Sequence, residues 1–244
     1  MADVIDMERG PAGQRAHWDW NLWSRWVLAN GLGELVGLGA VAVVGVALAK
    51  TFEAQMGSFA GLAGAGVMIT LGTFEGVVVG MAQWLVLRRP LPALSRRSWI
   101  LASAAGAFAA WTLGMIPSTL IGFGADAGAA PPAEMSDALM YGLAAAMGAV
   151  LGPILGVPQW LALRRHVRRA FWWIPANAGA WALGMPIVFV GAGSAPPGNV
   201  FWLVATGLLT AGAAGAVVGA MHGLVLVRLV QLPSNEQVEQ TYGG

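Results

Sequence analysis

Cysteine is absent from this 244-residue sequence, which excludes disulfide bonds and thiolate metal sites. Charge is scarce, since 10% of the residues are charged, against about 25% in typical soluble domains. Only three histidines occur, too few for a histidine metal cluster beside His222. The hydrolase patterns H-E-x-x-H and G-x-S-x-G are also missing. We therefore expect no enzymatic activity, no cofactor and no bound metal.

Apolar residues make up most of what is present. They account for 57% of the chain, the mean hydropathy is +0.66, and glycine occurs 35 times. A membrane core of about 30 Å is crossed by about 20 helical residues. Six apolar runs are at least that long, which predicts an all-α integral membrane protein with spans near 26–49, 61–87, 99–123, 138–163, 171–191 and 200–227.

An internal repeat organises these runs. Every second run contains small residues four positions apart, so that they share one face of a helix. Close helix packing is the ordinary use of such a face. Its glycines are Gly72, Gly76 and Gly80, then Gly148, Gly152 and Gly156, then Gly215 and Gly219.

The runs between them begin with a second motif, W-[VI]-x-A-[NS], at 26–30, 99–103 and 173–177. Three two-helix hairpins, 26–98, 99–172 and 173–230, thus enter the membrane in the same sense. Parallel repeats are related by an axis along the membrane normal. This predicts a pseudo-threefold six-helix bundle in one domain, 26–230, between an interfacial segment, 1–25, and a tail, 231–244.

The distribution of arginine predicts the orientation. Twelve of the 13 basic residues fall at one end of the spans, and Lys50 alone lies at the other. By the positive-inside rule that end is cytoplasmic, with both termini inside. The arginine pairs Arg88–Arg89 and Arg164–Arg165 are expected to contact anionic lipid. Nucleic acid is not an expected partner, whereas a second copy of the chain or a larger membrane complex stays open.

Four tryptophans stand within nine residues before and at the start of the first span. Indole rings favour the headgroup region, so an aromatic belt is expected there. A docking surface for a partner is the alternative. The residues are Trp18, Trp20, Trp23 and Trp26.

The motifs W-x-x-A-[NS] and G-x-x-Q-W-L-x-L-R-R, with the closing G-L-V-L-V-R-L, resemble those of uncharacterised bacterial polytopic membrane proteins. The resemblance covers most of residues 26–230. It implies a bacterial inner-membrane location and a six-helix fold, and it implies no activity. Gly223 departs from the pattern, because Trp84 and Trp160 occupy its position in the other copies.

Two acids lie inside the spans. Glu34 follows Asn30 by one helical turn, and Glu75 lies about 20 Å from the cytoplasmic edge. A charge at such depth costs at least ~2.5 kcal/mol, so each carboxyl group is expected to be protonated or partnered. Both are candidates for an ion path. The alternative is a single buried hydrogen bond from a neutral carboxyl group.

Gln83, Gln159 and His222 occupy equivalent positions of the repeat, three residues after its last aligned glycine. If the glycine faces converge, these side chains form a polar ring near the cytoplasmic mouth. Otherwise each bonds a neighbouring helix. Of the three, His222 alone is of a residue type whose ordinary pKa lies near neutral pH.

Two functions stay open on these observations. The first is a transporter or channel for a small solute or an ion, proton or cation, using intramembrane carboxylates. The second is a non-transporting accessory subunit or lipid-interacting scaffold.

Overall fold

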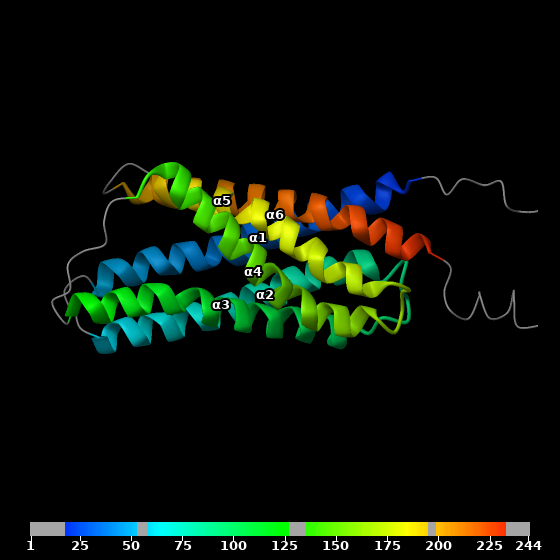
Figure 1. The fold of residues 1–244 in the computed structure, drawn as a ribbon, viewed down its shortest axis with the longest axis horizontal. Helices are drawn as coiled ribbons and strands as arrows, with labels where there is room; N and C mark the ends of the chain where they lie inside the picture. The colour runs from blue at the N-terminus through cyan, green and yellow to red at the C-terminus, as the bar shows by residue number, and fades with distance from the viewer. Residues whose placement is uncertain (1–17, 53–57, 127–134, 195–198, 233–244) are drawn as a thin grey trace, which may run out of the picture.

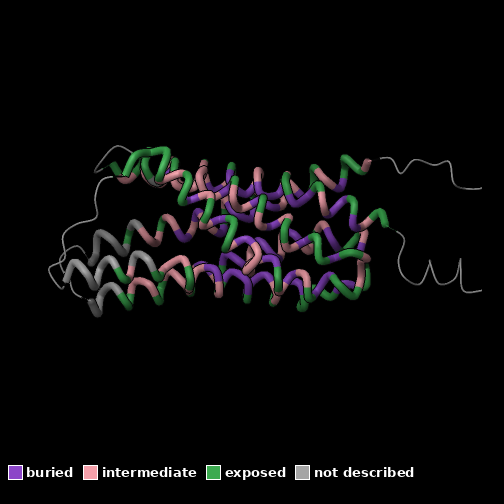
Figure 2. Tube along the Cα trace, in the orientation of Figure 1, coloured by how far each residue is buried: buried purple, intermediate pink, exposed green. Residues whose placement is uncertain are grey.

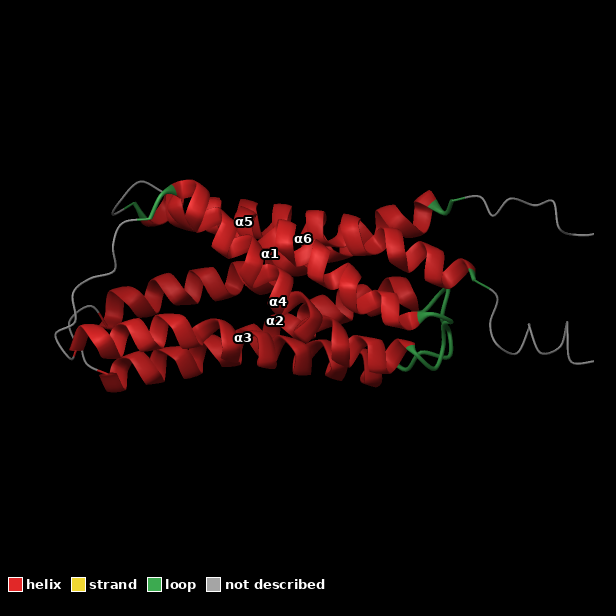
Figure 3. Ribbon diagram, viewed as in Figure 1, coloured by secondary structure: helices red, strands yellow, loops and turns green. Residues whose placement is uncertain are grey.

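The computed structural model describes residues 18–52, 58–126, 135–194 and 199–232. These ranges are helical and contain no strand (Figure 3). Six of the helices are long and apolar enough to cross a membrane, which supports a multi-pass membrane protein. They are α1 (Trp20–Phe52), α2 (Ser58–Leu87), α3 (Arg96–Asp126), α4 (Asp137–Leu163), α5 (Trp173–Gly193) and α6 (Val200–Gln231), with a short turn η2 (Ala170–Trp172) before α5.

Polar side chains define where several helices begin. Asp19 Oδ1 accepts the Leu22 backbone N–H at 2.9 Å, which caps the first turn of α1. Ser136 and Asn199 cap α4 and α6 in the same way. α1 begins six residues earlier than the apolar run suggests, because the polar residues 21, 24 and 25 face away from the bundle and are exposed. Helix α1 therefore takes in part of the tryptophan-rich segment.

The six helices form a closed ring. Each packs against its neighbours in sequence, and α6 packs against α1. In Figure 1 the described chain starts and ends at the same end of the bundle, where α1 begins and α6 finishes. The connections between α2 and α3 and between α4 and α5 lie at that end too. We call it the terminal end and the opposite one the distal end.

The glycine faces each pack onto a neighbouring helix and not onto one another. A Cβ atom at Gly76 on α2 would lie 2.9 Å from the Ser103 carbonyl oxygen of α3. One at Gly219 on α6 would lie 2.8 Å from Cβ of Asn30 on α1. The ladder of α4 contacts α5 similarly, around Asn177. Close approach of backbones is what glycine permits.

Burial is concentrated in the middle and terminal half of the bundle (Figure 2). A cluster of buried apolar side chains around Trp26, Trp99 and Trp173 fills the ring near the terminal end. Many large apolar side chains point outward, including Leu32, 59% exposed, and Leu120, 62% exposed. Exposed apolar surface of this extent suits contact with lipid chains.

Candidate functional site

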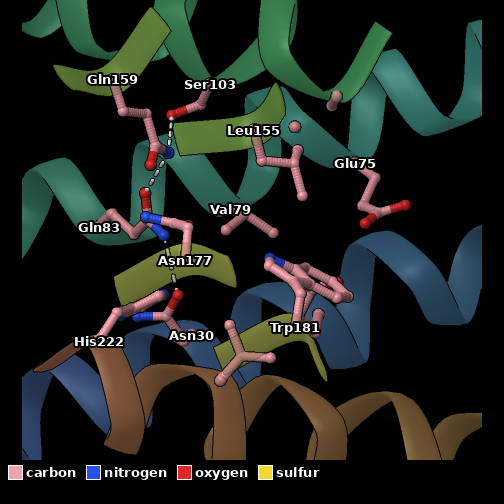
Figure 4. Close-up of a pocket in the computed structure, with 14 residues that line it drawn as sticks. Asn30, Glu75, Val79, Gln83, Ser103, Leu155, Gln159, Asn177, Trp181 and His222 are labelled. Atoms are coloured by element: carbon pink, nitrogen blue, oxygen red, sulfur yellow. Dashed lines mark hydrogen bonds between the residues drawn. The ribbon is translucent and has the colours of Figure 1, made fainter. Parts of the chain in front are cut away.

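A small polar cavity lies at the centre of the helix ring (Figure 4). Its volume is about 40 Å³, room for about three water molecules at the ~10–15 Å³ that each requires. All six helices contribute to its wall. The lining residues are Asn30, Glu34, Glu75, Gly76, Val79, Gln83, Ser103, Ala107, Leu155, Gln159, Asn177, Trp181, Val218 and His222.

A pair of carboxyl groups occupies one part of the wall. Glu34 is 4% exposed and Glu75 is 7% exposed, and the two groups lie within hydrogen-bonding reach of each other. Glu75 Oε2 accepts the indole N–H of Trp111 at 3.0 Å. Glu34 Oε2 is buried with no hydrogen-bond partner among the described residues. Two negative charges this close in an apolar interior would repel strongly, so the pair is best satisfied by a shared proton.

A network of amide side chains forms the wall toward the terminal end. Gln83 Nε2 donates to Asn30 Oδ1 at 2.8 Å. Gln159 Nε2 donates to Ser103 Oγ at 2.9 Å and to Gln83 Oε1 at 3.2 Å. Figure 4 marks these bonds, which join residues of α1, α2, α3 and α4. The amides thus link four helices through buried polar groups.

Three buried tryptophans each donate an indole N–H to a polar side chain of the cavity wall. Trp99 donates to Gln83 Oε1 at 3.2 Å and Trp173 to Gln159 Oε1 at 3.0 Å. Trp26 donates to His222 Nδ1 at 2.9 Å. Because Nδ1 accepts this bond, the neutral His222 ring carries its proton on Nε2. The same donor position therefore meets the same acceptor position on a neighbouring helix three times.

These tryptophans close the cavity on its terminal side. Each is 0% exposed, and the Trp26 and Trp99 rings both meet Trp173 edge to face, at 5.9 Å and 6.2 Å between centroids. Leu87, Leu163 and Leu226, also fully buried, pack in the same cluster. We call Trp26, Trp99 and Trp173 the tryptophan layer. It separates the polar cavity from the terminal end of the bundle.

The sequence-based candidates come together in this cavity. Its lining includes all six of Asn30, Glu34, Glu75, Gln83, Gln159 and His222. Gln83 and Gln159 are directly bonded, whereas His222 joins the group through Trp26. Each of the three bonds a neighbouring helix, as the alternative interpretation expected, and together they also line one space.

Trp26 differs from the expected aromatic belt. It is fully buried and bonded to His222, whereas Trp20, of the same segment, is 65% exposed. The Trp23 indole donates to the Ala220 carbonyl oxygen at 3.0 Å, which ties the start of α1 to α6. The segment is thus divided between the surface and the helix ring.

Sequence reasoning missed part of the wall. Ser103, Asn177 and the tryptophan layer all belong to the W-x-x-A-[NS] motif. That motif marked the repeat without being interpreted as a site. Its Trp and Asn/Ser are four residues apart, so both face the same neighbour, and this spacing was the available signal. Trp111 and Trp181 lie outside the two motifs of the repeat, so their sequence positions did not indicate a place at the site.

The arrangement restricts what the cavity can hold. Organic ligands occupy pockets of roughly 300–1,000 Å³, far above this volume. Hard cations require about six oxygen ligands, but the Gln83, Gln159 and Asn30 side-chain oxygens already accept hydrogen bonds. No cluster of three His, Cys, Asp or Glu side chains suited to a metal occurs in the described ranges. A proton with a few water molecules fits the free carboxyl oxygen and the volume.

Comparison of the chain with protein-family models, with curated proteins and with solved structures gives no match in any of the three.

Proposed function

We propose that this protein handles protons within the membrane, as a proton-conducting or proton-coupled channel or transporter. The observation that carries the proposal is the Glu34–Glu75 pair, whose two residues line a cavity of water size and which includes one unpartnered carboxyl oxygen, Oε2 of Glu34. A buried ionisable group without a basic partner is costly in a membrane and marks a functional site by default.

The arrangement of the repeats and the orientation in the membrane belong to the same proposal. We infer a pseudo-threefold arrangement of three parallel hairpins, supported by the three equivalent tryptophan bonds. We also infer a cytoplasmic terminal end in a bacterial inner membrane, because arginine is concentrated there. The protein carries out no covalent chemistry in this proposal.

Anionic lipid is the proposed partner at the terminal end. Arg88 and Arg96 lie over the Trp84 ring, at 5.8 Å and 6.0 Å from its centroid, and Arg164 lies over Trp160 at 5.3 Å. Such cation–π contacts hold exposed guanidinium groups near the indole rings. Arginine side chains at the terminal end of the bundle would lie near the phosphate groups of an anionic leaflet.

A non-transporting scaffold is the second candidate, and specific contacts favour it. Glu75 is held in place by Trp111, and the glycine faces pack closely between helices. The tryptophan layer also seals one side. In that case the chain would be an accessory subunit of a membrane complex, and Glu34 would be a neutral structural acid.

Proton flux into liposomes containing the purified protein separates the two candidates. We expect the wild type to dissipate an imposed pH gradient and the rate of the Glu75→Gln variant to fall at least about a hundredfold, the lower end of the effect typical for a proton-transfer group. The conservative amide keeps the size of the side chain and its hydrogen bond from Trp111. If the proton flux were the same with the wild type, with the variant and in protein-free liposomes, proton handling would be refuted. The scaffold function would then be the remaining candidate.

A further inference from the structure

His222 stands where the other two copies of the repeat have glutamine. Each of the three accepts an indole N–H, from Trp26, Trp99 or Trp173. A glutamine amide keeps its acceptor oxygen whatever the pH. An imidazole does not, because its protonated form has two N–H donors and no acceptor.

Protonation of His222 and the Trp26 bond are therefore mutually exclusive. The neutral ring has a single acceptor nitrogen, and Trp26 occupies it at 2.9 Å. A proton on that nitrogen would face the indole N–H donor to donor. We propose that His222 is a proton-operated latch, which releases Trp26 when it takes a proton and so opens the tryptophan layer on one side. This proposal rests on the proposed proton-handling function.

The position of the bond suits a latch. Trp26 is 0% exposed and belongs to the layer between the cavity and the terminal end. The His222 ring also lies 5.0 Å from the Trp173 ring, tilted by 38°. Because Trp26 meets the layer through Trp173, a shift of Trp26 would open the layer along this one contact. Trp99 and Trp173, bonded to glutamines, would serve as its fixed side.

The proton can come from the carboxyl pair. Glu34 and Glu75 are the other titratable side chains of the cavity wall, from α1 and α2; α3, α4 and α5 contribute none. On α6 itself, Gly215 contacts Glu34, and His222 lies seven residues further, about 10 Å along the helix. Two or three cavity waters would bridge this distance.

The transfer conserves charge within the cavity. The step starts from two neutral carboxyl groups. One of them loses its proton to water, the other proton stays shared by the Glu34–Glu75 pair, and water passes a proton to the imidazole, so that one negative charge on the pair and one imidazolium result. The net charge of the cavity stays unchanged, and the cavity waters solvate the two charges that form. Trp26 leaves His222 in the same event, so access at the terminal end is coupled to movement of the proton.

The His222→Gln variant tests the latch and keeps the fold. It recreates the glutamine of the other two copies, so Trp26 retains an acceptor. We expect proton flux in liposomes to fall at least about a hundredfold, while the infrared carboxyl band of the Glu34–Glu75 pair still changes with pH. His166→Gln is the matched control, because His166 lies in the connection before α5, outside the cavity, and should leave flux unchanged. Undiminished flux in His222→Gln would overturn the proposal.

Nuclear magnetic resonance of the indole N–H groups gives a second measurement that does not depend on flux. In the wild type, the Trp26 signal should shift with pH together with the His222 ring, while the signal of Trp99, bonded to Gln83, stays constant. In His222→Gln the signals of all three tryptophans should be constant. If the chemical shift of the Trp26 N–H did not change when His222 is protonated, the latch would be refuted even if protons are transported. Absence of flux in the wild type, with the Trp26 shift present, would instead refute the proposed function alone.

Discussion

At the scale of the residue, each tryptophan of the layer places one polar N–H in an apolar surrounding, and a single side chain satisfies it. Trp173 is fully buried and donates to Gln159, whereas the adjacent Trp172 is 51% exposed. Buried polar groups need a partner, and removing the donor also leaves the acceptor unsatisfied. The pair Trp172 and Trp173 therefore offers a built-in comparison.

We predict that Trp173→Phe destabilises the protein by about 1–3 kcal/mol, through lost packing volume and the unpaired oxygen of Gln159. Trp172→Phe should change the stability by less than ~0.5 kcal/mol, as exposed substitutions usually do. Reversible unfolding in mixed micelles would measure both. Equal effects of the two substitutions would mean that the Trp173–Gln159 bond has no stabilising role.

Trp111→Phe should alter the chemistry of Glu75 without removing the carboxyl group. Glu75 loses the N–H donor that it accepts at 3.0 Å. Loss of a hydrogen bond strengthens the carboxyl C=O bond, so its infrared band should move to higher frequency. Phe108→Leu on the same helix, 53% exposed, is the control and should leave the band in place. An unmoved band in Trp111→Phe would contradict the observed contact.

Residue types and their spacing were enough to single out the six candidate side chains, because polar groups inside apolar runs are few. They could not predict that Trp26 bonds His222, since 196 residues separate the pair. Nor could they place Glu34 beside Glu75, which depends on how α1 and α2 rotate against each other. Spacing along one helix is local information, whereas partners across helices are not.

At the scale of the element, the glycine ladders determine how closely paired helices approach. Helix α4 contains both kinds of glycine. A Cβ at Gly152 would overlap the backbone of Asn177 on α5, whereas a Cβ at Gly142 would meet no atom within 4 Å. Four-residue spacing predicted one packed face per helix, but it did not indicate which neighbour that face meets.

We predict that Gly152→Ala destabilises the bundle by about 1–3 kcal/mol, the usual cost of an added methylene in a well-packed contact. Gly142→Ala should be neutral or stabilising, by up to ~1 kcal/mol, because alanine favours helix. Unfolding in mixed micelles compares the variants. Similar effects at both positions would show that the α4–α5 contact tolerates added volume.

At the scale of the whole molecule, six helices form a ring around a polar centre, with both described ends on the same side. The number of spans and their approximate limits follow from apolar length alone. The order of helices around the ring does not, because lipid-facing and ring-facing surfaces are both largely apolar. The predicted pseudo-threefold bundle implies that the third hairpin meets the first, and in the structure α6 packs against α1.

The orientation can be tested with single cysteines, since the natural chain has none. Ser98 lies exposed at the start of α3 on the terminal side, and Met135 lies exposed before α4 on the distal side. A membrane-impermeant thiol reagent should label Ser98→Cys only from the cytoplasm and Met135→Cys only from outside. The opposite pattern would invert the topology, and with it the direction of the proposed latch.

Infrared difference spectroscopy of the carboxyl groups in lipid tests the central claim most directly. The wild type, Glu34→Gln and Glu75→Gln would be titrated between about pH 5 and pH 8, the range in which physiological proton exchange occurs. We predict that a carboxyl group of the wild type loses its proton reversibly in this range, so that its infrared band disappears and returns. In each variant this band should be altered or lost. If the band of the protonated carboxyl groups stayed unchanged throughout the titration, both acids would be structural. That result would contradict proton handling at this site.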